Sequence, residues 1–471
     1  PPAPAPPPAA PRERPSHRQL AHHPGGGFTE PRYLARRGDG QVVQLSLLLH
    51  LVASAIDGVR DTAAVAELVS ARFGREVSAE NVDYLIEHKL RPMGITAPPG
   101  PDADPVDIPR SDLLLGLTGR RVLLRERHVR RIGRSLAWLH RPWMVAAVLT
   151  GAVALDVWLF AVHGALGPVL QVLNQPVLLL AVFGLTVASL LFHEFGHASA
   201  CTYGGARPGP IGCGLYILWP SLYTDVTDVY RIGRAGRLRA DLGGVYFNVV
   251  FILGLAGGYA LTGHPLFLTA VLVGHIEIIE QLMPAVRLDG YFILGDLAGV
   301  PDLFGKIRPT LLSMLPGRPV RPEVAGLKRS ARTVVTVWVL TMVPLLAGEL
   351  GYVLWHLPRI LGTALHSLSE QVAGTVAAFT DREFSAGAVG VIGIFTLLCP
   401  LVGGGYLAVR TLGRLLRAAL RAVGRALRPA SRRRAAPAAP AAPAAHHPSP
   451  SAPPTSAEPL PSAVRTLRRS P

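Results

Sequence analysis

The chain has 471 residues, of which 49% are hydrophobic and only 17% charged, and its formal net charge is +16. Because an average soluble domain is about a quarter charged, the composition argues against a single soluble globule. The arginines lie beside apolar runs and not in an aromatic-rich patch, so a membrane is favoured over nucleic acid as the partner of this positive charge.

The N-terminal part of the chain is predicted to hold one small domain. Residues 1–31 are rich in proline and alanine, which predicts disorder. Residues 32–97 are expected to form an α+β domain of winged-helix-like type. Short strands are predicted over residues 33–45 and a helix over 47–56, and Asp61 and Ser78 are in position to cap two further helices.

Six long apolar stretches dominate the rest of the chain. A Pro- and Asp-rich linker, residues 98–109, and a basic juxtamembrane segment lead to them at residue 142. Each stretch is close to the 20 residues that a helix needs to cross a bilayer. The sequence therefore predicts a polytopic α-helical membrane domain over residues 143–411, followed by a basic, largely disordered tail over 412–471. The expected spans are 143–162, 177–200, 242–261, 266–295, 334–356 and 386–409.

Arginine clusters predict the orientation of these spans. Seven arginines between residues 120 and 134 precede the first span, and further clusters follow the second, fourth and sixth spans. Six spans place all of these clusters on one side, which the positive-inside rule makes cytoplasmic. We therefore expect a multi-pass protein of the cytoplasmic membrane, with both termini in the cytoplasm.

One motif near the end of the second span carries metal chemistry, His193-Glu194-Phe195-Gly196-His197. Histidines four residues apart share one face of a helix and can bind one zinc ion, and the intervening glutamate can deprotonate a water at that metal. A chance match to HExxH is expected only about 0.02 times in a chain of this composition. An apolar helix also has no structural use for three such polar residues.

A zinc peptidase needs a third protein ligand, and the fourth expected span offers Asp289 in Leu288-Asp289-Gly290. The second and fourth spans run in the same direction, so Asp289 and the histidines end at the same depth. Glu277, Glu280 and Glu349 are the competing candidates, with intramembrane polar packing as their alternative role.

Three motifs together resemble the site-2 protease family of intramembrane zinc metallopeptidases. They are the HEFGH sequence, Gly244-Val245-Tyr246-Phe247-Asn248, and Gln281-Leu282-Met283-Pro284 leading to Leu288-Asp289-Gly290. Val245 stands where the family usually has proline, and Gln281 where asparagine is common. The resemblance implies that His193, His197 and Asp289 bind one Zn²⁺ per chain and that Glu194 is the general base. It also implies that Asn248 lies near the site and holds substrate or an oxyanion.

Residues 32–95 are similar to the PqqD-like recognition domains of pathways that make ribosomal, modified peptides. Such domains bind a leader peptide as an added strand. The alternative is a generic winged helix on nucleic acid, although the segment lacks a basic stripe. The fusion resembles the intramembrane metalloproteases of daptide-type peptide biosynthesis, and it implies membrane lipid and a precursor peptide as partners and no nucleic acid.

The sequence leaves two further questions open. The segment from Gly212 to Pro220 is either a re-entrant hairpin beside the metal or a plain cytoplasmic loop. The expected function is a zinc-dependent intramembrane endopeptidase that cleaves a leader-bearing precursor. The alternative is a non-catalytic metal-binding, peptide-export or immunity component of the same fold, which would need the histidines but not Glu194.

Overall fold

The computed structural model describes residues 12–13, 20–22, 26–36, 42–97, 118–164, 166–216 and 219–426. The predicted linker 98–109 and the tail beyond residue 426 lie outside them. The chain forms two compact units, Pro1–Tyr406 and Leu407–Pro471. The helices and strands described below belong to the first unit. The last helix, Phe384–Ala426, is the exception, because its residues 407–426 belong to the second unit.

The N-terminal domain contains the expected strands and helices. β2, β3 and β4 form an antiparallel sheet in that order, and β1 pairs with β5. The Asp61 and Ser78 side chains accept hydrogen bonds from Ala64 N and Asn81 N, which confirms both predicted caps. The bounds are β1 Arg12–Glu13, β2 Leu20–His22, β3 Tyr33–Arg36, β4 Val42–Leu45, α1 Leu47–Ala55, α2 Thr62–Phe73, α3 Ala79–Leu85, the π-helical turn η1 Ile86–Leu90 and β5 Thr96–Ala97.

The core of this domain is formed by apolar side chains from its sheet and helices. Leu45 from the sheet, Val52 from α1 and Val65 from α2 are among its fully buried members. The prediction that residues 1–31 are disordered is wrong for parts of that segment, because β1 and β2 lie within it and pair with strands of this domain. Phe28 is buried and pairs as an isolated β-bridge with Leu327, about 300 positions later in the chain.

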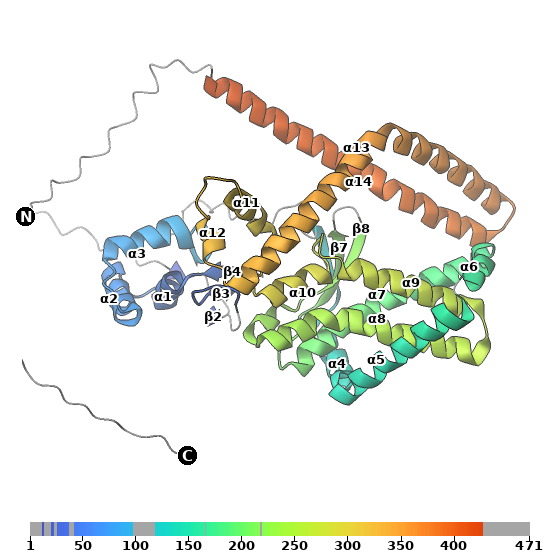
Figure 1. Cartoon of the computed structure of the whole chain (residues 1–471), viewed down its shortest axis with the longest axis horizontal. Coiled ribbons are helices and arrows are strands. Elements are labelled where there is room, and N and C mark those ends of the chain that lie inside the picture. Colours follow the sequence, from blue (N-terminus) through green and yellow to red (C-terminus); the bar gives the residue numbers. More distant parts are fainter. Residues whose placement is uncertain are drawn as a thin grey trace, which may run out of the picture. The chain divides into compact units, whose positions relative to one another are not determined.

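Within the described residues, six helices are long and apolar enough to cross a membrane, as a polytopic helical fold requires (Figure 1). Their bounds are Pro142–Val157 for α5, continued by the π-helical η3 Trp158–His163, then α7 Pro176–Tyr203, α8 Arg234–Thr262, α9 Pro265–Leu282, α13 Arg329–Thr380 and α14 Phe384–Ala426.

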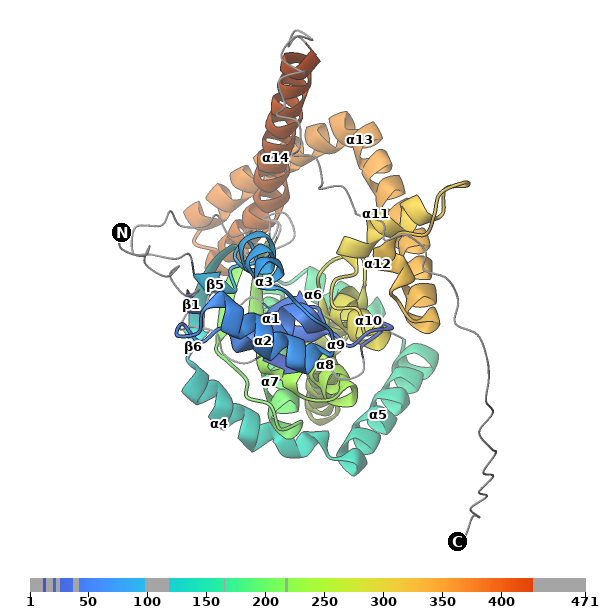
Figure 2. The same ribbon diagram turned by 90° about the vertical axis from the view of Figure 1, so that its left-hand side faces the viewer.

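Shorter elements connect these helices. β6, β7 and β8 form a second antiparallel sheet in that order. α4 and α5 follow one another in different directions (Figure 2). The bounds are β6 Thr118–Leu124, α4 Glu126–Leu136, η2 Ala137–His140, α6 Leu166–Leu173, β7 Ile211–Tyr216, β8 Trp219–Thr224, η4 Thr227–Arg231, α10 Asp289–Ala298, α11 Phe304–Ser313 and α12 Pro322–Ala325.

The fourth predicted span, 266–295, is not one helix. α9 ends at Leu282, Met283 is extended, and a new helix, α10, begins at Asp289. Pro284 explains the break, because it lacks an N–H group and disfavours a helical conformation at the residue before it. The consequence is that Asp289 begins a helix of its own.

The last two spans also differ from the prediction. α13 has 52 residues, about 78 Å at 1.5 Å per residue, so the expected span 334–356 is only its first part. This helix changes direction along its length (Figure 1) and contains Pro344 and Pro358, which disrupt helical hydrogen bonds. Residues 412–426, predicted as disordered tail, belong to α14.

Candidate metal centre

The two histidines of the HExxH motif lie one turn apart on α7 and meet Asp289 at the start of α10. Nε2 of His193 and Nε2 of His197 are 3.1 Å apart. Oδ2 of Asp289 is 3.2 Å from the first and 3.3 Å from the second. Ligands about 2.0 to 2.1 Å from a tetrahedral zinc lie about 3.3 Å from one another. The three atoms therefore have the spacing of a zinc ligand set.

Hydrogen bonds behind the rings fix which nitrogens face one another. His197 Nδ1 lies 2.8 Å from the carbonyl oxygen of Ala240 and must donate to it, since a carbonyl only accepts. His193 Nδ1 lies 2.5 Å from Asn248 Oδ1 and donates in the same way. In the neutral imidazoles both Nε2 atoms then present lone pairs to one another and to Asp289. Three acceptors this close are stabilised by a cation between them.

Asp289 Oδ2 supports the same conclusion. It is buried, and among the described residues it has no hydrogen-bond donor, because the imidazole nitrogens that it faces present lone pairs. This oxygen therefore lacks a donor, and the carboxylate form of Asp289 is the one that binds a metal.

Gly244 of α8 leaves the space in front of the imidazoles open. A β-carbon at this position would overlap His193 Nε2 and would lie 2.5 Å from His197 Nε2. Any side chain would occupy the volume between the ligand atoms. The sequence analysis included Gly244 in a motif but did not assign it this role.

Behind His193, a buried hydrogen-bond chain holds the ring. Asn248 is 1% exposed, and its Nδ2 donates to Ser189 Oγ at 3.0 Å and to Glu277 Oε2 at 3.2 Å. Ser189 also donates to Glu277, at 2.8 Å. Asn248 is thus placed as the partner that orients His193, while a substrate contact for it stays a prediction. Ser189, one helical turn before His193, was not singled out from the sequence.

The competing carboxylates lie outside the ligand set. Glu277 accepts hydrogen bonds from Ser189 and Asn248. Glu280 and Glu349 are exposed. Within the described ranges, His193, His197 and Asp289 are the group of ionisable side chains that meets metal-site spacing.

Glu194 is 7% exposed and hydrogen-bonds to the second sheet. Thr224 Oγ1, at the end of β8, lies 2.5 Å from Glu194 Oε2 and 3.1 Å from its carbonyl oxygen. β7 and β8 pair as antiparallel strands, and re-entry of this hairpin into the membrane, one of the two predictions for residues 212–220, stays a prediction. The hairpin thus brings Thr224 to the carboxylate of the HExxH motif. No family model, curated protein or solved structure matches this chain.

Proposed function

We propose that this protein is a zinc-dependent intramembrane endopeptidase. The observation that carries the proposal is the meeting of His193 Nε2, His197 Nε2 and Asp289 Oδ2 at 3.1 to 3.3 Å, with Glu194 adjacent to the first ligand. Three protein ligands leave the fourth zinc position for water and substrate, which is typical of a catalytic site and not of a structural one.

The residues of the chain would divide the reaction as follows. A zinc ion held by His193, His197 and Asp289 would supply Lewis acidity for acidifying water and polarising the scissile carbonyl. Glu194 accepts the proton of the attacking water and later returns it to the leaving amine. Thr224 holds the carboxylate in position through its hydroxyl. Asn248 keeps the His193 ring in the tautomer that binds metal.

The second sheet supports a peptide as substrate. β8 is an outer strand, and no other described strand pairs with its second edge. An extended peptide added to that edge would gain main-chain hydrogen bonds and would run toward Thr224, which contacts Glu194. A strand added at this edge also exposes the carbonyl groups that a helical substrate shields.

The N-terminal domain is proposed to recognise the leader of a precursor peptide. Its sheet ends in β4 on one side, an edge of the kind that accepts an added strand. We infer that this domain supplies affinity and the metal centre supplies chemistry. Removing residues 32–97 should then raise KM for a leader-bearing precursor much more than it lowers kcat. Equal KM values for the full and shortened chains would contradict leader recognition.

The peptidase proposal is tested by separating metal binding from turnover. Purified protein should hold about one zinc per chain by elemental analysis, and His193→Ala/His197→Ala should lose it. Glu194→Gln should keep zinc and lose cleavage of a membrane-embedded reporter peptide. Full turnover in Glu194→Gln would refute the mechanism. Zinc binding without cleavage in the wild type, across a panel of membrane peptides, would favour the non-catalytic alternative.

A further inference from the structure

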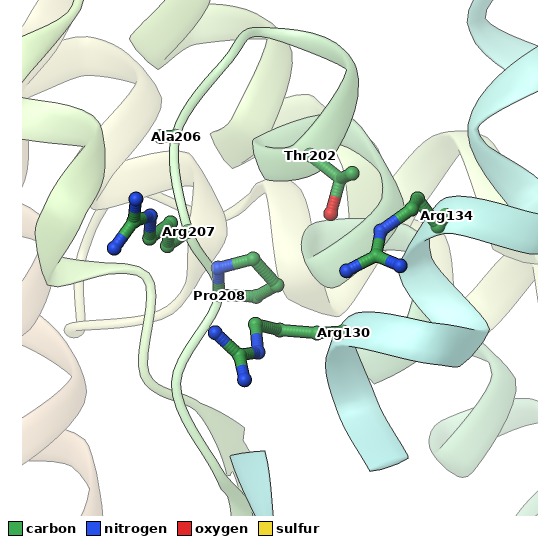
Figure 3. A pocket seen from close by; sticks show the side chains of 6 residues that line it. All are labelled: Arg130, Arg134, Thr202, Ala206, Arg207 and Pro208. Carbon is green, nitrogen blue, oxygen red and sulfur yellow. The ribbon is translucent and has the colours of Figure 1, made fainter. Parts of the chain in front are cut away.

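A cavity of about 320 Å³ lies between α4 and the C-terminal end of α7, outside the metal centre. Three arginines line it together with one hydroxyl and two apolar side chains, and no carboxylate does. Figure 3 shows Arg134 and Thr202 facing the space beside Pro208 and Arg130 next to Pro208, while the Arg207 side chain lies on the other side of the loop. The lining residues are Arg130, Arg134, Thr202, Ala206, Arg207 and Pro208.

Close packing of α4 on α7 holds two of the arginines in place. A β-carbon on Gly133 would lie 2.8 Å from Thr202 Oγ1 and 2.9 Å from the carbonyl oxygen of Ala198, so the two helices touch at this point. Val129 is fully buried in the same contact. Arg130 and Arg134 lie one helical turn apart on this part of α4, and both line the cavity.

The positive charges in this cavity are poorly compensated. Arg130 Nε is buried without a hydrogen-bond partner, and the carboxylate that pairs with its guanidinium among the described residues is the exposed Glu126, at 3.7 Å. Arg134 and Arg207 form no ion pair with any described residue. The Arg130 side chain is 41% exposed, but its buried Nε lacks an acceptor, and an anion in the cavity would supply one.

The cavity lies beside the ends of two apolar helices, which is the level of the phosphate groups if these helices span a bilayer. Thr202 is at the end of one apolar helix, α7, and α4 leads through η2 into another, α5. Trp138 and Trp143 are 46% and 59% exposed on this connection. Exposed tryptophans at the end of a span are typical of the membrane–water interface, and basic pockets at that level bind phosphorylated headgroups.

We propose that this pocket binds a phosphate group, carried either by the headgroup of an anionic phospholipid or by free phosphate. Arginine guanidinium groups match phosphate oxygens in geometry and charge, and the cavity is large enough for a phosphate with its ester substituents. Binding there would tie α4 to the end of the helix that carries the HExxH motif. The proposal does not depend on peptidase activity.

The test measures the Kd of the full-length protein in neutral detergent for two probes, short-chain phosphatidylglycerol and inorganic phosphate. Arg130→Gln/Arg134→Gln is compared with Arg127→Gln/Arg131→Gln, which removes the same charge from exposed positions of the same helix. The pocket pair should weaken binding at least about tenfold, and the control pair less than about threefold. If the two double variants lost affinity equally, or if the wild type bound neither probe, the proposed phosphate site would be refuted.

The two probes also identify the source of the phosphate. Binding of the lipid that millimolar inorganic phosphate does not displace supports a phospholipid headgroup. If inorganic phosphate displaces the lipid, and Arg130→Gln/Arg134→Gln weakens binding of both probes equally, free phosphate is supported as the ligand. If the double variant does not fold, Arg207→Gln is used in its place, because the Arg207 side chain is exposed on a loop. This single substitution should weaken binding of the probe about fivefold. Unchanged affinity in Arg207→Gln would then refute the proposal.

Discussion

Arg237 of α8 and Asp296 of α10 form a buried ion pair, with Arg237 Nε 3.1 Å from both carboxylate oxygens. Arg237 is fully buried, and its Nη1 also donates to the carbonyl oxygen of Ile232. Asp296 follows Asp289 by seven residues, so the two carboxylates lie on the same face of α10, two turns apart. The ion pair therefore holds against α8 the face of α10 that presents the third metal ligand.

Breaking this ion pair is expected to disturb both stability and metal binding. Arg237→Met leaves Asp296 as an uncompensated buried charge, so the free energy of unfolding should fall by about 3 to 5 kcal/mol and zinc affinity should drop. Arg237→Met/Asp296→Leu removes both charges and should recover part of the lost stability and part of the lost zinc affinity. Thermal denaturation and zinc competition measure the two quantities.

The exposed pair Arg231–Asp228, with 3.3 Å between its charged atoms, provides the control. Arg231→Met should change stability by less than about 1 kcal/mol, because solvent screens an exposed ion pair. If Arg237→Met/Asp296→Leu were no more stable and bound zinc no more tightly than Arg237→Met, these residues would not act as a pair.

A methyl group at Gly244 is expected to abolish metal binding. Its β-carbon would lie among the ligand nitrogens of His193 and His197, so Gly244→Ala should contain less than about a tenth of the wild-type zinc. Gly254→Ala is the matched control on the same helix, because a β-carbon there meets nothing within 4 Å. Elemental analysis of both proteins decides the question, and wild-type zinc content in Gly244→Ala would refute the proposed metal position.

Asn248 is expected to act through His193. Asn248→Ala removes the acceptor for His193 Nδ1 and should weaken zinc binding about 10- to 100-fold. At saturating zinc, kcat should return close to the wild-type value if orientation of His193 is its only role. A loss of kcat that added zinc does not repair would instead support the substrate or oxyanion contact expected from the motif.

The comparison of sequence and structure shows which relationships local patterns encode. The spacing of His193 and His197 follows from helix geometry alone, and the end of their span is visible as a change in hydropathy. The break at Pro284 is harder to place, because the apolar run continues through it to residue 295. Hydropathy reports burial in lipid and does not report where a helix bends.

Long-range partners could not be predicted. Arg237 belongs to a basic cluster that the sequence places at the membrane surface, yet its side chain is buried against Asp296, 59 positions later. Phe28 stands in a Gly-rich stretch whose composition predicts disorder. Its packing partners lie about 260 to 310 residues away, and nothing in the local sequence indicates them.

His140 is expected to make stability depend on acid pH. Burial, with a contribution from Arg239, lowers the pKa of His140 to about 4, and its Nε2 lies 2.8 Å from Ser199 Oγ. The unfolded chain takes up this proton near pH 6.5 while the folded protein does not, so stability is lost as pH falls from about 6.5 to about 4. Thermal midpoints of wild type and His140→Phe should therefore converge toward pH 5. A constant difference between them from pH 7.5 to 5 would contradict this assignment.

Phe28 is expected to stabilise the domain that carries the metal centre. It is buried in a cluster with Tyr291 of α10 and Trp338 of α13, and the backbone on either side is held as well. Gly27 N donates to the carbonyl oxygen of Gly299 at 2.8 Å, and Lys328 N donates to that of Gly27 at 2.7 Å. The segment before the N-terminal domain thus covers the helix that begins with Asp289.

Phe28→Ala leaves a cavity in this cluster and should lower the free energy of unfolding by about 3 kcal/mol. Gly27→Ala should be similarly damaging, since its β-carbon would overlap the carbonyl oxygen of Ala298. Phe384→Ala is the control, because that side chain is 67% exposed and its loss should change stability by less than about 0.5 kcal/mol. Thermal denaturation and limited proteolysis near residue 30 measure the effect. If Phe28→Ala matched Phe384→Ala in thermal stability and in the rate of proteolysis, the contact between this segment and α10 would not stabilise the fold.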